Sequence, residues 1–125
     1  EFRRVLFRSS PVERDAYLTP STAKASRLAQ LRFVQDIPLT PDHPTHALVT
    51  EVQGKLTQFQ RTPTLICWGA KDWVFDDHFL AEWKRILPQA EVHRFPDASH
   101  LVLEDKPDEI LALVKQFFAK HPVKE

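Results

Sequence analysis

Hydrophobic positions along the first half of this chain recur at helical spacing. Over residues 23–34 and 44–59 the apolar side chains return every three or four positions, which predicts two helices. Residues 11–18 are compatible with a shorter helix before them, and Ser21 or Thr22 is expected to cap the helix that follows. A proline-rich stretch separates the two longer helices, because a residue that precedes proline avoids the α-helical conformation.

Helical and strand patterns alternate in the second half of the chain. Residues 64–68 form an unbroken apolar run, as in a strand buried on both faces, and residues 91–95 alternate like a strand nearer a sheet edge. Helices are expected over residues 76–87 and from Pro107 to a stop at residues 121–122. This order predicts an α/β fold with parallel strands and right-handed crossovers. Because a buried strand needs a neighbour on each side, we expect the sheet to be incomplete.

Composition excludes several classes of function. With Gly54 and Gly69 as its two glycines, the chain cannot form a Walker A loop, a dinucleotide-binding fingerprint or a G-x-S-x-G nucleophile elbow. Its 17 basic residues balance its 17 acidic ones, so no overall charge attracts nucleic acid or an anionic membrane. The apolar runs are too short for a membrane span. A single cysteine excludes an intrachain disulfide and fits a reducing compartment, so we expect a cytoplasmic protein.

Two loops carry residues suited to acid–base chemistry. Asp72 lies four residues after the strand predicted at 64–68, and His100 lies five residues after Phe95, the end of the next strand. Functional groups in open α/β sheets gather beyond the carboxyl ends of the strands, so adjacent parallel strands would bring these loops together. A carboxylate beside an imidazole fixes its tautomer and stabilises it when it takes a proton. We therefore predict His100 as a base and Asp72 as its acid partner.

The segments around these two positions resemble the active-site loops of α/β-hydrolases. Segment 68–74, WGAKDWV, is similar to the acid loop of that family, and segment 97–100, DASH, to its histidine loop, where glycine is more usual than the serine. The spacing of 28 residues between Asp72 and His100 is typical of the last two active-site loops of the family. The resemblance covers residues 11–120.

The resemblance implies a fold class and a division of the chain. The fold would be α/β, the C-terminal part of an α/β-hydrolase: the end of a helical cap, then the last two parallel strands with flanking helices, in an incomplete sheet. Residues 10–41 would end the cap, and residues 42–125 would belong to the core.

Residues 1–9, EFRRVLFRS, match the translation of a common sequencing adapter, and we interpret them as non-native. Since the chain does not begin with Met, we expect it to be a fragment.

Two further segments carry a finer resemblance. Residues 33–39, FVQDIPL, together with residues 76–80, DDHFL, resemble the haloalkane-dehalogenase-like branch, in particular the β-lactone decarboxylases of olefin biosynthesis. That resemblance implies an Asp nucleophile upstream of this chain, which forms a covalent ester with an apolar electrophile such as a haloalkane or a β-lactone. His100, oriented by Asp72, would activate water to hydrolyse the ester. No metal and no organic cofactor are implied, and the chain alone is expected to be inactive.

Two other functions are compatible with the sequence. A Ser-dependent ester hydrolase would place serine at the upstream nucleophile position, whereas a non-catalytic binding or structural module would need no nucleophile. The expected partner of the hydrolase is a small apolar substrate, with no nucleic acid and no membrane span, and the oligomeric state is left open.

Several residues near the two loops have a functional and a structural interpretation. Val74 and Leu101 flank the loops, so they either line a substrate pocket or pack beneath it. Glu104 either braces the histidine loop or is a solvated acid.

His43 and His46 have a spacing found in metal sites, but no third ligand accompanies them, so no metal site is expected.

Overall fold

The structure, a computed structural model, describes residues 10–122 apart from the side chains of Ser21 and Lys24. The segment interpreted as adapter-derived, residues 1–9, lies outside the described residues. The chain forms two compact units, one ending at Lys55 and the other beginning at Leu56. The division of cap from core at residues 41 and 42 stays a prediction.

The first unit is helical. Its elements are α2 (Pro11–Leu18), the 3-10 helix η1 (Thr19–Ser21), α3 (Lys24–Gln35) and α4 (His46–Lys55). α2 begins with a capping box, in which the Ser10 hydroxyl accepts the N–H of Glu13 at 3.3 Å and the Glu13 carboxylate accepts the N–H of Ser10 at 2.7 Å. The helices predicted from apolar spacing in this half are therefore confirmed.

The predicted cap of α3 is wrong. The N-cap residue is Ala23, and no side chain caps the helix. The hydroxyl of Thr22 instead donates to the carbonyl of Thr19 at 3.2 Å, within the turn that joins η1 to α3. An N-cap residue has an extended backbone, which Ala23 has and Thr22 does not, so the helix begins after Ala23 and not after Thr22.

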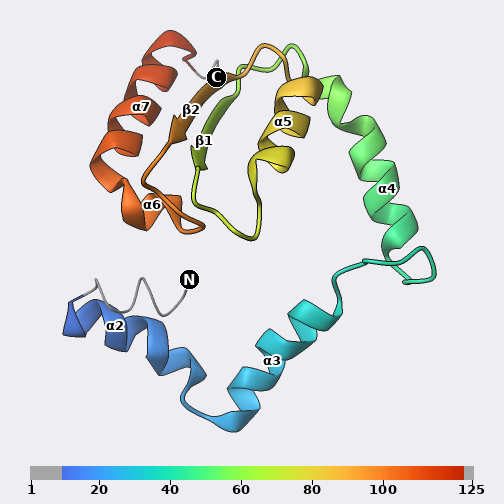
Figure 1. Cartoon of the computed structure of the whole chain (residues 1–125), viewed down its shortest axis with the longest axis vertical. Helices are drawn as coiled ribbons and strands as arrows, with labels where there is room; N and C mark the ends of the chain where they lie inside the picture. Colours follow the sequence, from blue (N-terminus) through green and yellow to red (C-terminus); the bar gives the residue numbers. More distant parts are fainter. Residues whose placement is uncertain (1–9, 123–125) are drawn as a thin grey trace. The chain divides into compact units, whose positions relative to one another are not determined.

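The second unit is an α/β arrangement. It contains the 3-10 helix η2 (Leu56–Phe59) and the elements β1 (Leu65–Gly69), α5 (Asp77–Ile86), β2 (Glu91–Phe95), α6 (Val102–Asp105) and α7 (Pro107–Lys120). The strands β1 and β2 are parallel, and their register runs from Leu65 opposite Glu91 to Gly69 opposite Phe95. Figure 1 shows α5 on one side of the strand pair and α7 on the other. Within the described residues the sheet has two strands, as the sequence predicted.

Local chemistry explains where the helices of the second unit begin. The carboxylate of Asp76 accepts the N–H of His78 at 2.9 Å and caps α5, while Pro107 occupies the first turn of α7, where its missing N–H costs nothing. The four-residue helix α6 was not predicted, since one turn is too short to show a hydrophobic period. The buried hydrophobic side chains of the described residues all lie in this unit: Leu80, Ile86, Leu87, Ala98 and Ile110.

Candidate active site

The loops that follow the two strands are joined by backbone hydrogen bonds. The N–H of Ala70 donates to the carbonyl of Phe95, and the N–H of Lys71 donates to the carbonyl of Ala98, both at 2.9 Å. The N–H of Asp72 turns back to the carbonyl of Gly69 at 3.1 Å. The loop after β1 therefore lies directly against the loop after β2, as parallel pairing predicts.

Gly69 allows this close approach. It is buried at the end of β1, and a Cβ atom built on it would lie 2.1 Å from the carbonyl oxygen of Ser99 and 3.0 Å from the carbonyl carbon of Ala98. Real Cβ atoms do not approach so closely, and the obstructing atoms belong to the backbone, which cannot swing aside as a side chain can. A residue without a Cβ is thus required for the histidine loop to pack on β1.

Asp72 and His100 meet at this edge of the sheet. Nδ1 of His100 lies 3.1 Å from Oδ1 and 3.0 Å from Oδ2 of Asp72. The Asp72 side chain is 9% exposed and the His100 side chain 33% exposed, so the carboxylate is enclosed while the imidazole reaches solvent. Oδ1 of Asp72 also accepts the N–H groups of Val74 and Phe75, at 2.8 and 3.0 Å. The loop thus fixes the carboxylate, and the carboxylate holds the imidazole.

The hydrogen bonds keep Asp72 ionised. Burial by itself raises the pKa of Asp72, but the N–H of Phe75, the imidazole of His100 and the N–H of Val74 outweigh it, so the pKa lies below its ordinary value. An ionised carboxylate can only accept hydrogen bonds, so the proton between the two residues sits on Nδ1 of His100. Nε2 of His100 then carries a free lone pair and can act as a base.

The titration of Asp72 tests this assignment. We expect its carboxyl carbon, followed by NMR, to titrate with a midpoint below the ordinary value of about 3.9 for aspartate. Because the folded-state pKa is depressed, the stability from these hydrogen bonds is fully present above the ordinary value and is lost as pH falls through the folded-state value. A midpoint at or above the ordinary value would contradict the geometry.

The histidine loop is braced from the chain that follows it. Ser99 is 3% exposed, its N–H donates to Oδ2 of Asp105 at 2.7 Å, and its hydroxyl lies 3.3 Å from the carbonyl of Lys71. The sequence indicates Glu104 as a possible brace, and this stays a prediction; the acid that accepts the N–H of Ser99 is its neighbour Asp105, at the end of α6. Asp105 could not be singled out from the sequence, because the single turn of α6 shows no helical period.

The residues predicted to contact substrate lie beside the pair. Val74 is exposed and its N–H is held by Asp72, while Leu101 is half-buried directly after His100. The ring of Phe75 lies against the imidazole, with 5.6 Å between the ring centroids. Contact of Val74 or Leu101 with substrate stays a prediction.

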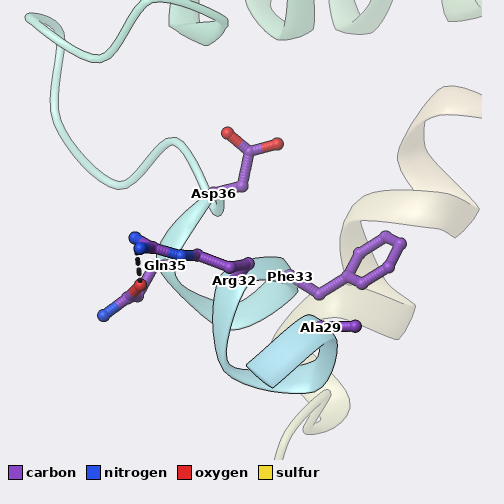
Figure 2. Close-up of a pocket in the computed structure, with 5 residues that line it drawn as sticks. All are labelled: Ala29, Arg32, Phe33, Gln35 and Asp36. Carbon is purple, nitrogen blue, oxygen red and sulfur yellow. Dashed lines mark hydrogen bonds between the residues drawn. The ribbon is translucent and has the colours of Figure 1, made fainter. Parts of the chain in front are cut away.

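Two hollows are lined by residues other than this pair. One, of about 510 Å³, is on α3 and is lined by Ala29, Arg32, Phe33, Gln35 and Asp36. Figure 2 shows the Arg32 side chain hydrogen-bonded to Gln35, at 3.3 Å, with the Phe33 ring directed away from both. The other hollow, of about 280 Å³, is in the second unit and is lined in part by Thr64, at the start of β1. Neither hollow includes the paired aspartate and histidine among these lining residues.

His43 has ordinary hydrogen-bond partners. Nδ1 of His43 lies 3.0 Å from the hydroxyl of Thr45, and its Nε2 lies 3.8 Å from Asp36. Over residues 10–122, no three His, Cys, Asp or Glu side chains are grouped as a metal ion would require.

None of the helices in that range is long and apolar enough to cross a membrane.

Comparison with known proteins points to one fold family. The sequence model of a family described as the alpha/beta hydrolase fold matches residues 13–107. A cis-3-alkyl-4-alkyloxetan-2-one decarboxylase of Shewanella oneidensis is 46% identical over 107 residues, which are 86% of this chain and 34% of that protein. The decarboxylase of the same name from Xanthomonas campestris is 41% identical over 110 residues, which are 88% of this chain and 37% of that protein. The chain thus spans about a third of the length of these relatives.

A more distant relative is a lipase. Lipase 1 of Psychrobacter immobilis is 31% identical over 67 residues, which are 54% of this chain and 21% of that protein. The resemblance to β-lactone decarboxylases inferred from the sequence is confirmed, since an oxetan-2-one is a β-lactone.

Proposed function

This chain belongs to the alpha/beta hydrolase fold family, and we propose that it supplies the base and the acid of an enzyme that acts on apolar β-lactones. In this proposal His100 is the base, Asp72 orients it, and a nucleophilic Asp comes from a part of the enzyme outside these residues. The observation that carries the proposal is the contact of both Asp72 carboxylate oxygens with Nδ1 of His100, which leaves Nε2 open to the reacting groups.

The β-lactone substrate is taken from the two decarboxylases. Loss of carbon dioxide from such a ring breaks the bond from the ring oxygen to C4 and the bond from C2 to C3, and forms a double bond between C3 and C4. If the nucleophile attacks C4, the ring opens to an enzyme ester with a free carboxylate on C3. Departure of carbon dioxide then expels the nucleophile and completes the alkene. No water is consumed, and His100 serves in this route as the base that keeps the nucleophilic Asp ionised for its attack on C4.

Water gives a different product from the same ester. If Nε2 of His100 takes a proton from water, the resulting hydroxide hydrolyses the ester to a β-hydroxy acid and regenerates the nucleophile. This is the step by which a haloalkane, which carries no carboxylate to lose, would be turned over. The product therefore reports which route the enzyme follows, and we propose the alkene route because both decarboxylases carry that reaction in their names.

The test is an assay of the protein encoded by the complete reading frame that contains this chain. We expect conversion of a synthetic cis-3,4-dialkyl-oxetan-2-one to the alkene and carbon dioxide, both measured by gas chromatography with mass spectrometry. His100→Ala is expected to lower turnover about 100-fold or more, the usual contribution of a general base. His78→Ala is the matched control, since that histidine lies on the surface and its side chain is 95% exposed. Release of only β-hydroxy acid would refute the decarboxylation.

The chain by itself gives a second test of the proposal. Because the nucleophile is assigned to another part of the enzyme, we expect the purified 125-residue polypeptide to show no lactone loss above the rate in buffer. Turnover by this polypeptide, abolished by His100→Ala, would place the nucleophile within these residues and overturn the assignment.

A Ser-dependent ester hydrolase is the second candidate, favoured by the match to Lipase 1. The two candidates differ in the nucleophile, so a fluorophosphonate probe separates them. Covalent labelling of the complete protein by the probe would support the serine enzyme, whereas an unlabelled protein that converts the lactone supports the aspartate enzyme.

A further inference from the structure

The loop that carries His100 is held from the junction of α6 and α7 by two charged side chains. The Asp105 carboxylate accepts the N–H of Ser99 at 2.7 Å, and Nζ of Lys106 lies 2.7 Å from the Asp97 carboxylate. The two contacts bracket Ala98, which is completely buried. Asp105 and Lys106, which are consecutive in the sequence, thus hold the loop at the two residues that flank Ala98, just before the histidine.

We infer that Asp105 and Lys106 are positioning residues, which set the direction of the His100 imidazole by clamping the backbone of the histidine loop. This inference rests on the proposed function, in which His100 is the base. Ser99 immediately precedes His100, so a shift of its backbone moves the Cα atom of the histidine directly. The N–H of Ser99 is buried with the residue, and its bond to the carboxylate is both charge-assisted and short.

The surroundings of the clamp show why it controls direction. On the opposite side of the loop, the carbonyl of Ala98 accepts the N–H of Lys71, and the Ser99 hydroxyl lies 3.3 Å from the carbonyl of Lys71. The histidine loop is therefore held between the acid loop and the junction of α6 and α7. If the contacts on one of these sides are lost, the loop can move toward the other side. Nζ of Lys106 also contacts Glu109 at 3.1 Å, so its ammonium is held in place from α7.

The ion pair stays charged near neutral pH. The hydrogen bond to Lys106 lowers the pKa of Asp97, and the carboxylates of Asp97 and Glu109 raise the pKa of Lys106. The clamp is therefore already formed at the pH at which His100 would work, and it needs no further protonation step.

The first test follows the imidazole directly, in the 125-residue chain. Long-range proton–nitrogen NMR reports the fraction of His100 with its proton on Nδ1. We expect Asp105→Ala to shift this fraction toward the value in an unstructured peptide, and Asp105→Asn to restore it, because the amide oxygen still accepts the N–H of Ser99. Asp108→Ala, a first-turn acid of α7, is the matched control and is expected to leave the fraction unchanged.

Lys106→Met gives an independent test, since it keeps the apolar stem and removes the ammonium. We expect it to shift the same tautomer fraction, in a protein that keeps Asp105. If Asp105→Ala does not fold, this variant decides the question. Tautomer fractions equal to those of the unaltered chain in whichever of the two variants folds would overturn the inference and leave both residues with a purely structural role.

Kinetics of the complete protein provide the last test. We expect Asp105→Ala to lower kcat about 10- to 100-fold with KM unchanged, since a misdirected base slows the chemical step without weakening substrate binding. A loss confined to thermal stability, with kcat retained, would contradict the positioning role. If the unaltered complete protein does not convert lactones, the proposed function fails, while the tautomer fractions still decide the inference.

Discussion

Replacement of Asp72 by Asn is expected to lower the turnover of the complete protein by about 10⁴-fold while the fold is retained. In the structure, Oδ1 of Asp72 accepts the N–H groups of Val74 and Phe75. An asparagine would keep these two bonds only with its oxygen at that position, which places its NH₂ group against Nδ1 of His100. Nδ1 must then accept, so the proton moves to Nε2 and the imidazole can no longer act as a base there.

The same substitution, aspartate to asparagine, at a nearby position provides the control for this prediction. Asp76→Asn alters a carboxylate four residues away, but asparagine caps a helix as well as aspartate does, so α5 and the turnover are expected to be unaffected. Circular dichroism checks the fold of both variants, and the nitrogen NMR shifts of His100 report the tautomer. Full turnover in Asp72→Asn would show that the acid partner of the histidine lies elsewhere.

Replacement of Gly69 by Ala is expected to lower the free energy of unfolding of the second unit by about 1–3 kcal/mol, the usual cost of overpacking. The new Cβ would lie 2.1 Å from the carbonyl oxygen of Ser99, so the histidine loop or β1 has to move. This destabilisation comes from steric overlap alone, because Gly69 has an ordinary backbone conformation without a positive φ. Movement of the loop would also disturb the contact of His100 with Asp72.

The other glycine of the chain is a matched control. Gly54 lies within α4, and a Cβ atom built there meets nothing within 4 Å. Gly54→Ala is therefore expected to be neutral or to stabilise its helix by up to about 1 kcal/mol, since alanine favours the helix. Chemical denaturation of both variants measures the difference. Equal stabilities would show that the loop adapts to a methyl group at position 69 without cost.

The main elements and the Asp–His pair were predictable because their signals are local. Apolar spacing marks α3, α4 and α7, the unbroken apolar run marks β1, and a helix between two strands favours parallel pairing. Parallel pairing then places the loops after both strands at one edge, which is why Asp72 and His100 could be matched across 28 residues. The cap of α3 was mispredicted because the chain becomes extended at Ala23, one residue after Thr22, and a backbone angle of this kind leaves no pattern in the sequence.

By itself, the sequence determined the type and order of the longer helices and the two strands, and the two side chains that meet beyond the strands, since periodicity and strand order act along the chain. Only the tertiary structure decided what holds those side chains. The hydrogen bond from Ser99 to Asp105 depends on the single turn of α6, and the need for glycine at position 69 depends on the backbone of Ser99, thirty residues away. Such contacts leave no pattern in the sequence, because each is set by how close two separate loops come.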